Sequence, residues 1–390
     1  MKILLLKPQD ICYGLIDKFV QNFGVSLSKY SIEIVYYDFK IQPVDDLLNV
    51  LKDNYSAIVD FYSGLLHLKT GNGDYFWNYI DTPIFQICLD FPLYILDKMN
   101  PSLQNYYMLC LDQNYCSIVH DCMPNILKAY FFPMAGLEGP YKIPWNERTH
   151  EIIFIGTYSD YRPWLSALNQ SDKNMHIIGY TFFCNMRDHV DLNQKQAFEL
   201  TLSQLNLHLS TVEFYKTLEI LSGIGMCATS FYRELVIKTL LEDGLKIEVF
   251  GNSWKNSPLA KYPNLIILEQ LNESEYISVM QNAKISLNLS YCNHNSLSER
   301  YSYTMLNGAV CVSDITTYLS MEFSDGHDII FYQLDQLNNL PKKIRFLLNN
   351  PKTCQKIASS AYKKAIQKHT WDERAKRFLE ILDELQKQSS

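Results

Sequence analysis

The sequence of 390 residues lacks the short motifs that identify several common enzyme classes. None of its nine histidines belongs to an H-E-x-x-H pair, and neither G-x-S-x-G nor the phosphate-binding loop G-x-x-x-x-G-K-S/T occurs. Zinc proteases, serine hydrolases and P-loop NTPases are therefore disfavoured. We expect no bound metal.

Cysteine pairs with metal-binding spacing are lacking too. The ten cysteines include no C-x-x-C, and the closest grouping is Cys110, Cys116 and Cys122 with His120, which does not have the paired spacing of a zinc site. Buried, reduced thiols are the favoured interpretation. Because free thiols are typical of a reducing compartment, we expect a cytoplasmic protein.

Long hydrophobic runs and concentrated basic stretches are also missing. The apolar run before Lys7 is shorter than the ~7 to 15 residues of a signal-peptide core, and no run approaches the ~20 residues of a membrane span. The formal net charge is -7 and the lysines and arginines are scattered, which argues against nucleic acid as a partner. We expect a soluble protein, and peripheral docking on a membrane stays open.

The composition that is present is globular. Hydrophobic residues make up 47% and charged residues 20%, which is far from the balance that leaves a chain disordered. At roughly 100 to 200 residues per domain, the length predicts two domains.

In the first domain, short apolar runs alternate with helical patterns, such as those at residues 14–27 and 44–51. The runs predict strands at residues 2–6, 32–36, 57–61, 83–89, 107–111 and 128–132. Strands that alternate with helices indicate a mostly parallel, doubly wound sheet.

A second domain follows a linker. Residues 136–150 collect two glycines and two prolines, and strands are then predicted at 151–155, 246–250, 265–268, 283–289 and 309–313. No strand signal occurs from residue 191 to 227, which predicts a helical insertion over about 191–230. The expected division is 1–145, 150–370 and a C-terminal helix, 371–390, that packs back on the first domain.

Turns after parallel strands are the places to look for a ligand site. Gly156, with Thr157 and Tyr158, follows one predicted strand, and Gly251 follows another. A glycine lets the backbone approach a ligand closely, although a tight turn alone would explain it. Tyr158, Tyr301 and Phe91 are aromatic residues that could stack on a base or sugar ring.

The helix predicted near residues 298–308 carries a cation in its first turn. Ser296 or Ser298 can cap this helix, and Glu299 and Arg300 follow the cap. Arg300 then shares the helix end that attracts anions. The alternative is a surface arginine paired with Glu299 or Glu322.

Two carboxylates follow strands of the first domain. Asp90 comes after the strand at 83–89, and it could act as a general base on an acceptor hydroxyl or cap the next helix. Asp112, after the strand at 107–111, has the same two interpretations.

The last third of the chain has the most specific pattern. SERYSYTMLNGAVCVSDITTYLSMEF, from Ser298, and HTWDERAKRFLEIL, from His369, give an Arg-containing helix, a G-A-hydrophobic strand ending in Asp, and a terminal H-T-W-x-x-R-A. In this order of elements the chain resembles GT-B glycosyltransferases, in particular the CgeB-like group. The resemblance implies an α/β fold with two doubly wound Rossmann-like domains that face each other across a cleft.

The resemblance also implies a donor site in the second domain and an acceptor site in the first. Arg300 and the Gly156 turn would hold a diphosphate, Gly308 would allow close helix–strand packing beside the donor, and Asp90 would be the base. The residues implied for donor binding are Gly156, Thr157, Tyr158, Arg162, Gly251, Ser298, Glu299, Tyr303 and Gly308.

The chain departs from the family pattern at three positions. Tyr303 stands where many GT-B enzymes have a glutamate that holds the ribose, and Phe91 and Met134 stand in place of two histidines.

The implied activity is metal-independent transfer of a hexose or N-acetylhexosamine from a nucleotide diphosphate sugar, with UDP favoured, to a hydroxyl of a surface glycan or protein. No further cofactor is expected. The alternative, motivated by Tyr303, Phe91 and Met134, is a non-catalytic GT-B module that binds and regulates a partner glycosyltransferase. Epimerisation of a sugar nucleotide on the same fold is a third possibility.

Overall fold

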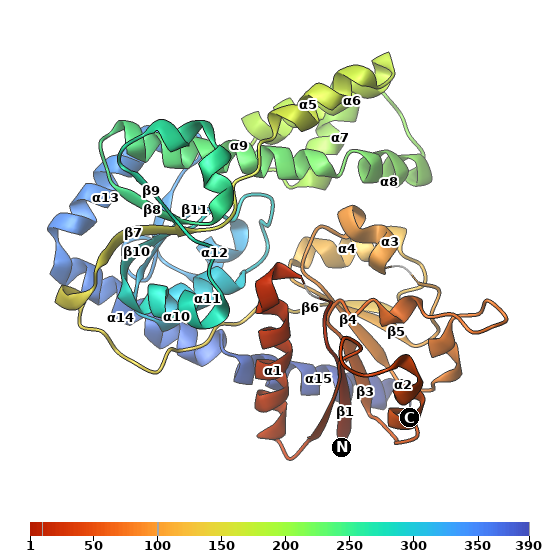
Figure 1. Cartoon of the computed structure of the whole chain (residues 1–390). Coiled ribbons are helices and arrows are strands. Elements are labelled where there is room, and N and C mark those ends of the chain that lie inside the picture. The colour runs from red at the N-terminus through yellow and green to blue at the C-terminus, as the bar shows by residue number, and fades with distance from the viewer. Residues whose placement is uncertain (10, 100, 390) are drawn as a thin grey trace. The chain divides into compact units, whose positions relative to one another are not determined.

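The computed structural model describes residues 1–9, 11–99 and 101–389. The chain forms two compact units: Met1–Gly136 with Gln367–Ser390, and Leu137–Ile366 (Figure 1). The chain thus leaves the first unit at the start of the predicted linker and returns to it near residue 366.

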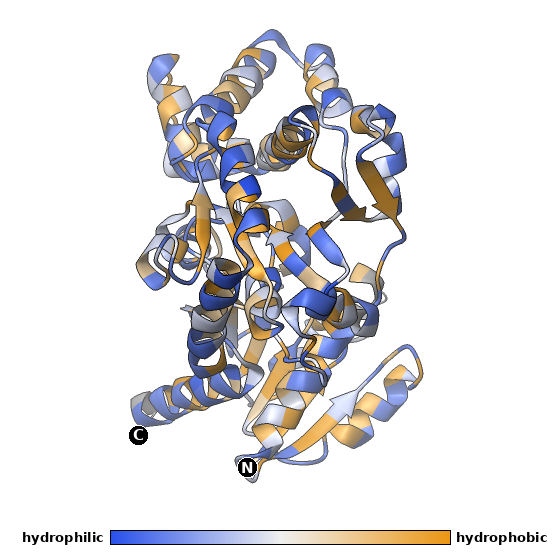
Figure 2. Cartoon of the chain, turned by 90° about the vertical axis from the view of Figure 1, so that its left-hand side faces the viewer, coloured by the Kyte–Doolittle hydropathy of each residue, from blue (hydrophilic) through white to orange (hydrophobic). Residues whose placement is uncertain are grey.

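The first unit is built on a six-stranded, all-parallel sheet. Its strands lie in the order β2-β1-β3-β4-β5-β6, with the order reversing between β1 and β3. Apolar residues fill the strands, which are mostly orange in Figure 2, because both faces of such a sheet are covered. The strands are β1 (Lys2–Leu6), β2 (Glu33–Tyr37), β3 (Ala57–Asp60), β4 (Ile84–Cys88), β5 (Tyr106–Cys110) and β6 (Lys128–Phe131).

Two helices from opposite ends of the chain pack together in this unit. They are α1 (Leu15–Ser28) and the C-terminal α15 (Trp371–Ser389), which lie side by side in Figure 1. Phe23 of α1 contacts Phe378 and Trp371 of α15, with ring centroids 5.4 and 6.3 Å apart. The remaining helices are α2 (Val44–Val50), α3 (Leu96–Met99) and α4 (Gln113–Cys122).

The second unit has its own six-stranded parallel sheet, in the order β12-β11-β10-β7-β8-β9. Counted from β7, this is the Rossmann order 3-2-1-4-5-6. The strands are β7 (His150–Ile155), β8 (Ile247–Phe250), β9 (Leu265–Leu268), β10 (Ala283–Leu287), β11 (Val310–Asp314) and β12 (Ile330–Tyr332). The sequence did not predict β12, which has only three residues.

The helical segment of this unit is longer than expected. It comprises α5 (Arg162–Ala167), α6 (Lys173–Asp188), α7 (Gln194–Gln204), α8 (Thr211–Ile220) and α9 (Gly223–Glu242). Capping boxes at Asn193 and Ser210 start α7 and α8. The boundary predicted near residue 230 falls inside α9, so the insertion and the core of the unit share one continuous helix.

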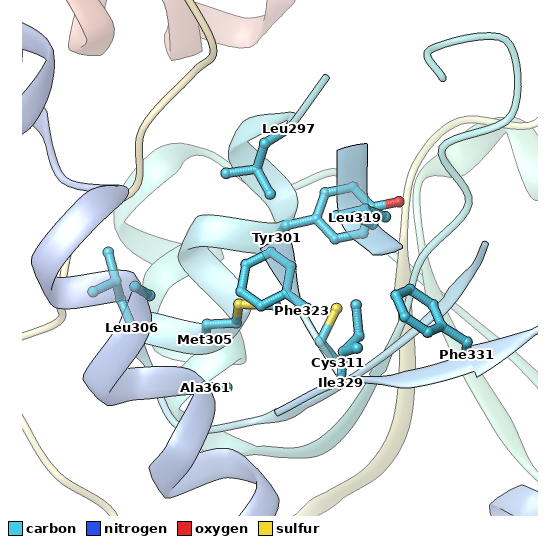
Figure 3. Packing of buried hydrophobic residues seen from close by; sticks show 11 residues of the cluster. Leu297, Tyr301, Met305, Leu306, Cys311, Leu319, Phe323, Ile329, Phe331 and Ala361 are labelled. Atoms are coloured by element: carbon cyan, nitrogen blue, oxygen red, sulfur yellow. The ribbon is translucent and has the colours of Figure 1, made fainter. Parts of the chain in front are cut away.

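The other helices of the second unit alternate with its strands. They are α10 (Glu273–Asn282), α11 (Glu299–Leu306), α12 (Thr317–Glu322), α13 (Leu340–Asn349) and α14 (Pro351–Lys368). One face of α11 is buried in a cluster that includes Leu297, Tyr301, Met305 and Phe331 (Figure 3). Burial of this face fixes the orientation of the helix.

By length and composition, none of the single helices in the described ranges could cross a bilayer, whereas α8 and α9, bent by 47° at their break, satisfy that test as a pair.

Candidate functional site

The strand order of the second unit indicates where a ligand site lies. Ligands of doubly wound sheets bind at the carboxyl ends of the strands where the order reverses, here β7 and β10. Gly156 directly follows β7, and Gly251 follows the neighbouring β8 with a φ of +148°. A Cβ added to Gly251 would lie 3.3 Å from the carbonyl oxygen of Gly156, which also accepts a 2.7 Å hydrogen bond from Trp254 Nε1. The two glycine turns therefore meet at this edge.

Two arginines flank the Gly156 turn. Nη1 of Arg300, in the first turn of α11, lies 3.7 Å from the position that a Cβ of Gly156 would take. Arg233 of α9 donates through Nη1 to the carbonyl of Thr157, and its Cζ lies 5.7 Å from the ring centroid of Phe154. Across the described residues, neither guanidinium has a carboxylate partner, and Nε of Arg233 is buried without a hydrogen bond.

The charged form of Arg233 is disfavoured by its surroundings. Burial, and to a smaller extent the like charge of Arg300, lower the pKa of Arg233 to about 9. Arginine still carries its charge at neutral pH. Among the described residues neither guanidinium is in an ion pair, and Arg300 acts electrostatically on the buried Asp314, whose pKa burial raises and Arg300 lowers in part. Two such guanidinium groups suit phosphate oxygens.

The start of α11 adds an unsatisfied hydroxyl. Ser298 precedes the helix but its side chain makes no capping hydrogen bond, so the predicted cap is wrong. Ser298 is 8% exposed, and its Oγ is buried without a partner, as is Oγ of Ser302 one turn later. Free N–H groups at a helix start also attract anions. Glu299 makes no ion pair with Arg300 in the described structure.

The loop after β10 is held by a buried carboxylate. Asp314, at the end of β11, accepts hydrogen bonds from the Ser290 N–H at 2.7 Å and from Ser313 Oγ at 3.0 Å. Burial raises the pKa of Asp314 to about 6. Asp314 thus ties the end of β11 to the loop that leads toward α11.

Comparisons with known proteins agree with this architecture. Residues 232–380 match a family model described as glycosyl transferase-like, and no curated protein matches the chain. Among solved structures, the chain is similar to Alr3699/HepE of Anabaena in complex with UDP-glucose, with 11% identity, a TM-score of 0.52 and coverage of 98% of this chain and 100% of that one.

Two further structures give the same picture. A glycosyltransferase from Rickettsia africae has 10% identity, a TM-score of 0.55 and coverage of 99% and 98%. The β-glucosyltransferase of phage T4, in complex with its UDP-glucose substrate, has 12% identity, a TM-score of 0.55 and coverage of 98% and 100%. The fold is GT-B. At these identities the likeness establishes the fold alone.

Some residues predicted to bind the sugar donor make contacts within the GT-B chain instead of facing the carboxyl edge of the second sheet. Arg162 forms ion pairs with Glu234 and Asp160, and Tyr158 donates from its hydroxyl to Glu234 at 2.9 Å. The charge of Arg162 is therefore compensated within the chain. Tyr158 also packs against Trp254, with ring centroids 5.4 Å apart, so its ring belongs to the wall of the turn.

Other predicted residues lie elsewhere in the GT-B chain. Tyr303 is fully buried against Tyr276 of α10, with ring centroids 5.1 Å apart, and does not reach the edge where a ribose-binding glutamate was expected. Gly308 precedes β11 and so lies at the amino end of the sheet, opposite Gly156. Tyr301 is buried in the cluster of Figure 3 and cannot stack on a ligand.

In the first unit, the two aspartates have different roles. Asp112 is buried and caps α4 by accepting from the Asn114 N–H at 2.7 Å, which is the structural interpretation. Asp90 is exposed after β4, and Phe91, not Asp90, occupies the cap position of the following 3-10 helix. Phe91 is itself buried against Tyr115, with ring centroids 5.9 Å apart.

Sequence reasoning missed Arg233. Nothing in the string FYRELV distinguishes a site arginine from a surface one, so the sequence analysis assigned Arg233 no role. Only the contact between α9 and the turn after β7 places it beside Arg300. No group of three or more His, Cys, Asp or Glu residues within the described ranges could hold a metal ion.

Proposed function

We propose that this chain is a glycosyltransferase that moves a sugar from a nucleotide diphosphate sugar to a hydroxyl acceptor. The observation that carries the proposal is the pair Arg233 and Arg300, without carboxylate partners among the described residues, beside the Gly156 turn at the β7/β10 reversal. The matched family model over residues 232–380 contains both arginines and supports the same activity.

The arginines fit the chemistry of such a transfer. When the glycosidic bond breaks, negative charge gathers on the diphosphate leaving group, and fixed guanidinium and N–H donors stabilise it. Because the arginines supply this positive charge, we propose that the reaction needs no metal ion. Loss of one such donor typically costs about 3 kcal/mol of transition-state stabilisation.

For the donor, we propose a UDP-hexose or UDP-N-acetylhexosamine, since similar GT-B structures contain UDP-glucose. The acceptor would be a hydroxyl of a surface glycan or a protein, and Asp90, exposed after β4, would remove its proton. The CgeB-like group remains the proposed subfamily. A cytoplasmic location is supported by the ten free cysteines.

The test is nucleotide release from a panel of UDP-, GDP-, dTDP- and CMP-sugars, with products identified by mass spectrometry. Release from one donor, reduced at least tenfold in Arg300→Ala and in Arg233→Ala, is the expected result. Arg345→Ala is the matched control, because Arg345 is paired with Asp243 on the outside of α9 and α13. Equal turnover by Arg300→Ala and the control would contradict the assignment.

One observation favours the non-catalytic alternative. Position 303 holds a buried tyrosine where many GT-B enzymes have the glutamate that holds the ribose. A module that binds and regulates a partner glycosyltransferase would bind UDP through Arg233 and Arg300 and release no nucleotide from any donor. Binding without turnover, together with stable association with a second glycosyltransferase, would favour this alternative.

A further inference from the structure

A separate pocket of about 290 Å³ opens at the amino end of the second sheet. It lies between the linker after residue 137, the yellow loop near α14 in Figure 1, and one face of α14. Asn307 and Gly308, which precede β11, form part of its wall. Because Gly156 and Gly251 follow the carboxyl ends of their strands, this pocket is distinct from the proposed donor site.

Arg148 lines the pocket and cross-links the backbone segments around it. Its guanidinium donates to four backbone carbonyls, those of Ile143 at 3.2 Å, Ala283 at 2.7 Å, Gly308 at 2.8 Å and Asn307 at 3.1 Å. These bonds join the linker to the starts of β10 and β11. Four of the five N–H groups of Arg148 are thereby used within the chain.

Aromatic and polar groups also line the pocket. The ring centroid of Trp145 lies 5.7 Å from Cζ of Arg148, and Trp145 lines the pocket. On α14, Tyr362 donates from its hydroxyl to Glu138 at 3.0 Å, and Lys142 lies 5.0 Å from the Tyr362 ring and 3.4 Å from Glu138. Ser359, one turn before Tyr362, adds a hydroxyl to the lining.

We propose that this pocket binds a neutral saccharide. A pyranose presents C–H faces that pack on aromatic rings and hydroxyl edges that both donate and accept hydrogen bonds. Trp145 and Tyr362 supply the rings, Glu138 supplies acceptors, and Lys142 and Ser359 supply donors. The pocket would retain a glycan away from the reacting centre.

The charges of the pocket favour a neutral ligand over an anion. Lys142 forms an ion pair with Glu138, and Arg148 donates hydrogen bonds to backbone carbonyls. A phosphate would meet the Glu138 carboxylate, and four of the five N–H groups of Arg148 already donate to carbonyls, in contrast to the Arg233 and Arg300 edge. A wholly apolar ligand would offer no hydrogen-bond partner to the Ser359 hydroxyl in the lining.

The experiment is ligand-observed NMR titration of the full chain with neutral gluco-, cello-, malto- and chito-oligosaccharides. We expect saturation transfer from the protein to one or more of them, weakened at least tenfold in affinity by Trp145→Ala and severalfold by Tyr362→Phe. Trp164→Ala is the control, because Trp164 is a 49% exposed tryptophan on α5 of the helical insertion. Far-UV circular dichroism of each variant checks that it is folded.

The outcomes separate this pocket from the donor site. Saccharide binding that persists in Arg300→Ala, while UDP binding is lost, is expected. Failure of every oligosaccharide to bind, binding unchanged in Trp145→Ala, or a preference of the pocket for UMP or inorganic phosphate would overturn the proposal. None of these results depends on whether the chain transfers sugar.

Discussion

Removing Arg300, which like Arg233 forms no ion pair with the described residues, should stabilise the ligand-free protein while weakening donor binding. The pKa of Arg233 is lowered from 12.5 to about 9, and a shift of that size corresponds to roughly 5 kcal/mol of cost for holding the charge in the folded state. Burial is the larger cause and Arg300 the second. Arg300 is therefore the smaller cause, and its removal should relieve a repulsion on the order of 1 kcal/mol.

Arg300→Gln relieves that repulsion. For a unit of this size, about 1 kcal/mol shifts the melting temperature by roughly 2 to 4 °C, so a rise of about 3 °C is expected without ligand. With UDP at a hundredfold excess over Kd, the wild type should gain about 2.7 kcal/mol of stability, and the variant much less. The two curves should therefore cross as UDP is added.

The assay is thermal unfolding across a UDP titration, with calorimetric Kd values for both proteins. Arg345→Gln, which breaks the exposed pair with Asp243, serves as the control and should change neither quantity by more than a small amount. A lower melting temperature for ligand-free Arg300→Gln, together with an unchanged Kd for UDP, would refute the reasoning, because it would mean that Arg300 stabilises the fold and binds no anion.

Three further predictions follow from named contacts. Burial raises the pKa of Asp314 from 3.8 to about 6, so the free energy of unfolding of the wild type should fall as pH rises from 4 to 7. Relative to Asp314→Asn, the fall measured by denaturant unfolding should be about 3 kcal/mol. Parallel plots of unfolding free energy against pH for the two proteins would contradict this prediction. Arg148→Met breaks four hydrogen bonds to carbonyls and should cost about 3 to 5 kcal/mol, with Arg148→Lys in between. Gly251→Ala is strained at φ +148° and meets the Gly156 carbonyl, so it should cost about 1 to 3 kcal/mol and weaken UDP binding, whereas an alanine at Gly71, which has open space, should do neither.

The strands were predictable because each is a short apolar run bounded by turn residues. The buried runs at β1, β3 and β7 satisfy the requirement of a sheet covered on both faces, and the predicted runs overlap these strands to within a residue or two. β12 was not predicted, because three residues are too few to show a pattern. The helical segment also begins before the predicted residue 191, with α5 and α6.

The site was only partly predictable for a different reason. Gly156, Gly251 and Arg300 follow strands or start a helix, and such positions can be read from a strand–helix pattern. Tyr303 and Tyr301 are on the same helix as Arg300, but packing against α10 and β11 decides which way they point. Arg233 lies in the middle of α9, where periodicity gives no sign of the turn that it contacts.

Arg233 and Glu234, neighbours on α9, have opposite effects on the positive charge near the Gly156 turn. Arg233 adds an unpaired charge, whereas Glu234 compensates Arg162. Glu234 therefore limits how strongly the edge attracts anions in general. Glu234→Gln would leave Arg162 with Asp160 as its remaining carboxylate partner.

We expect Glu234→Gln to bind inorganic pyrophosphate about threefold to tenfold more tightly at low salt, because the negative charge that pairs with Arg162 is removed. The gain should fade as salt rises toward 0.5 M, since partly exposed charges are screened. The ligand-free variant should be less stable, because the Arg162 and Tyr158 contacts to a half-buried carboxylate are lost. Isothermal titration with pyrophosphate at two salt concentrations measures the effect. Unchanged affinity at low salt would show that Arg162 lies too far from the bound anion, and that Arg233 and Arg300 alone determine binding at this edge.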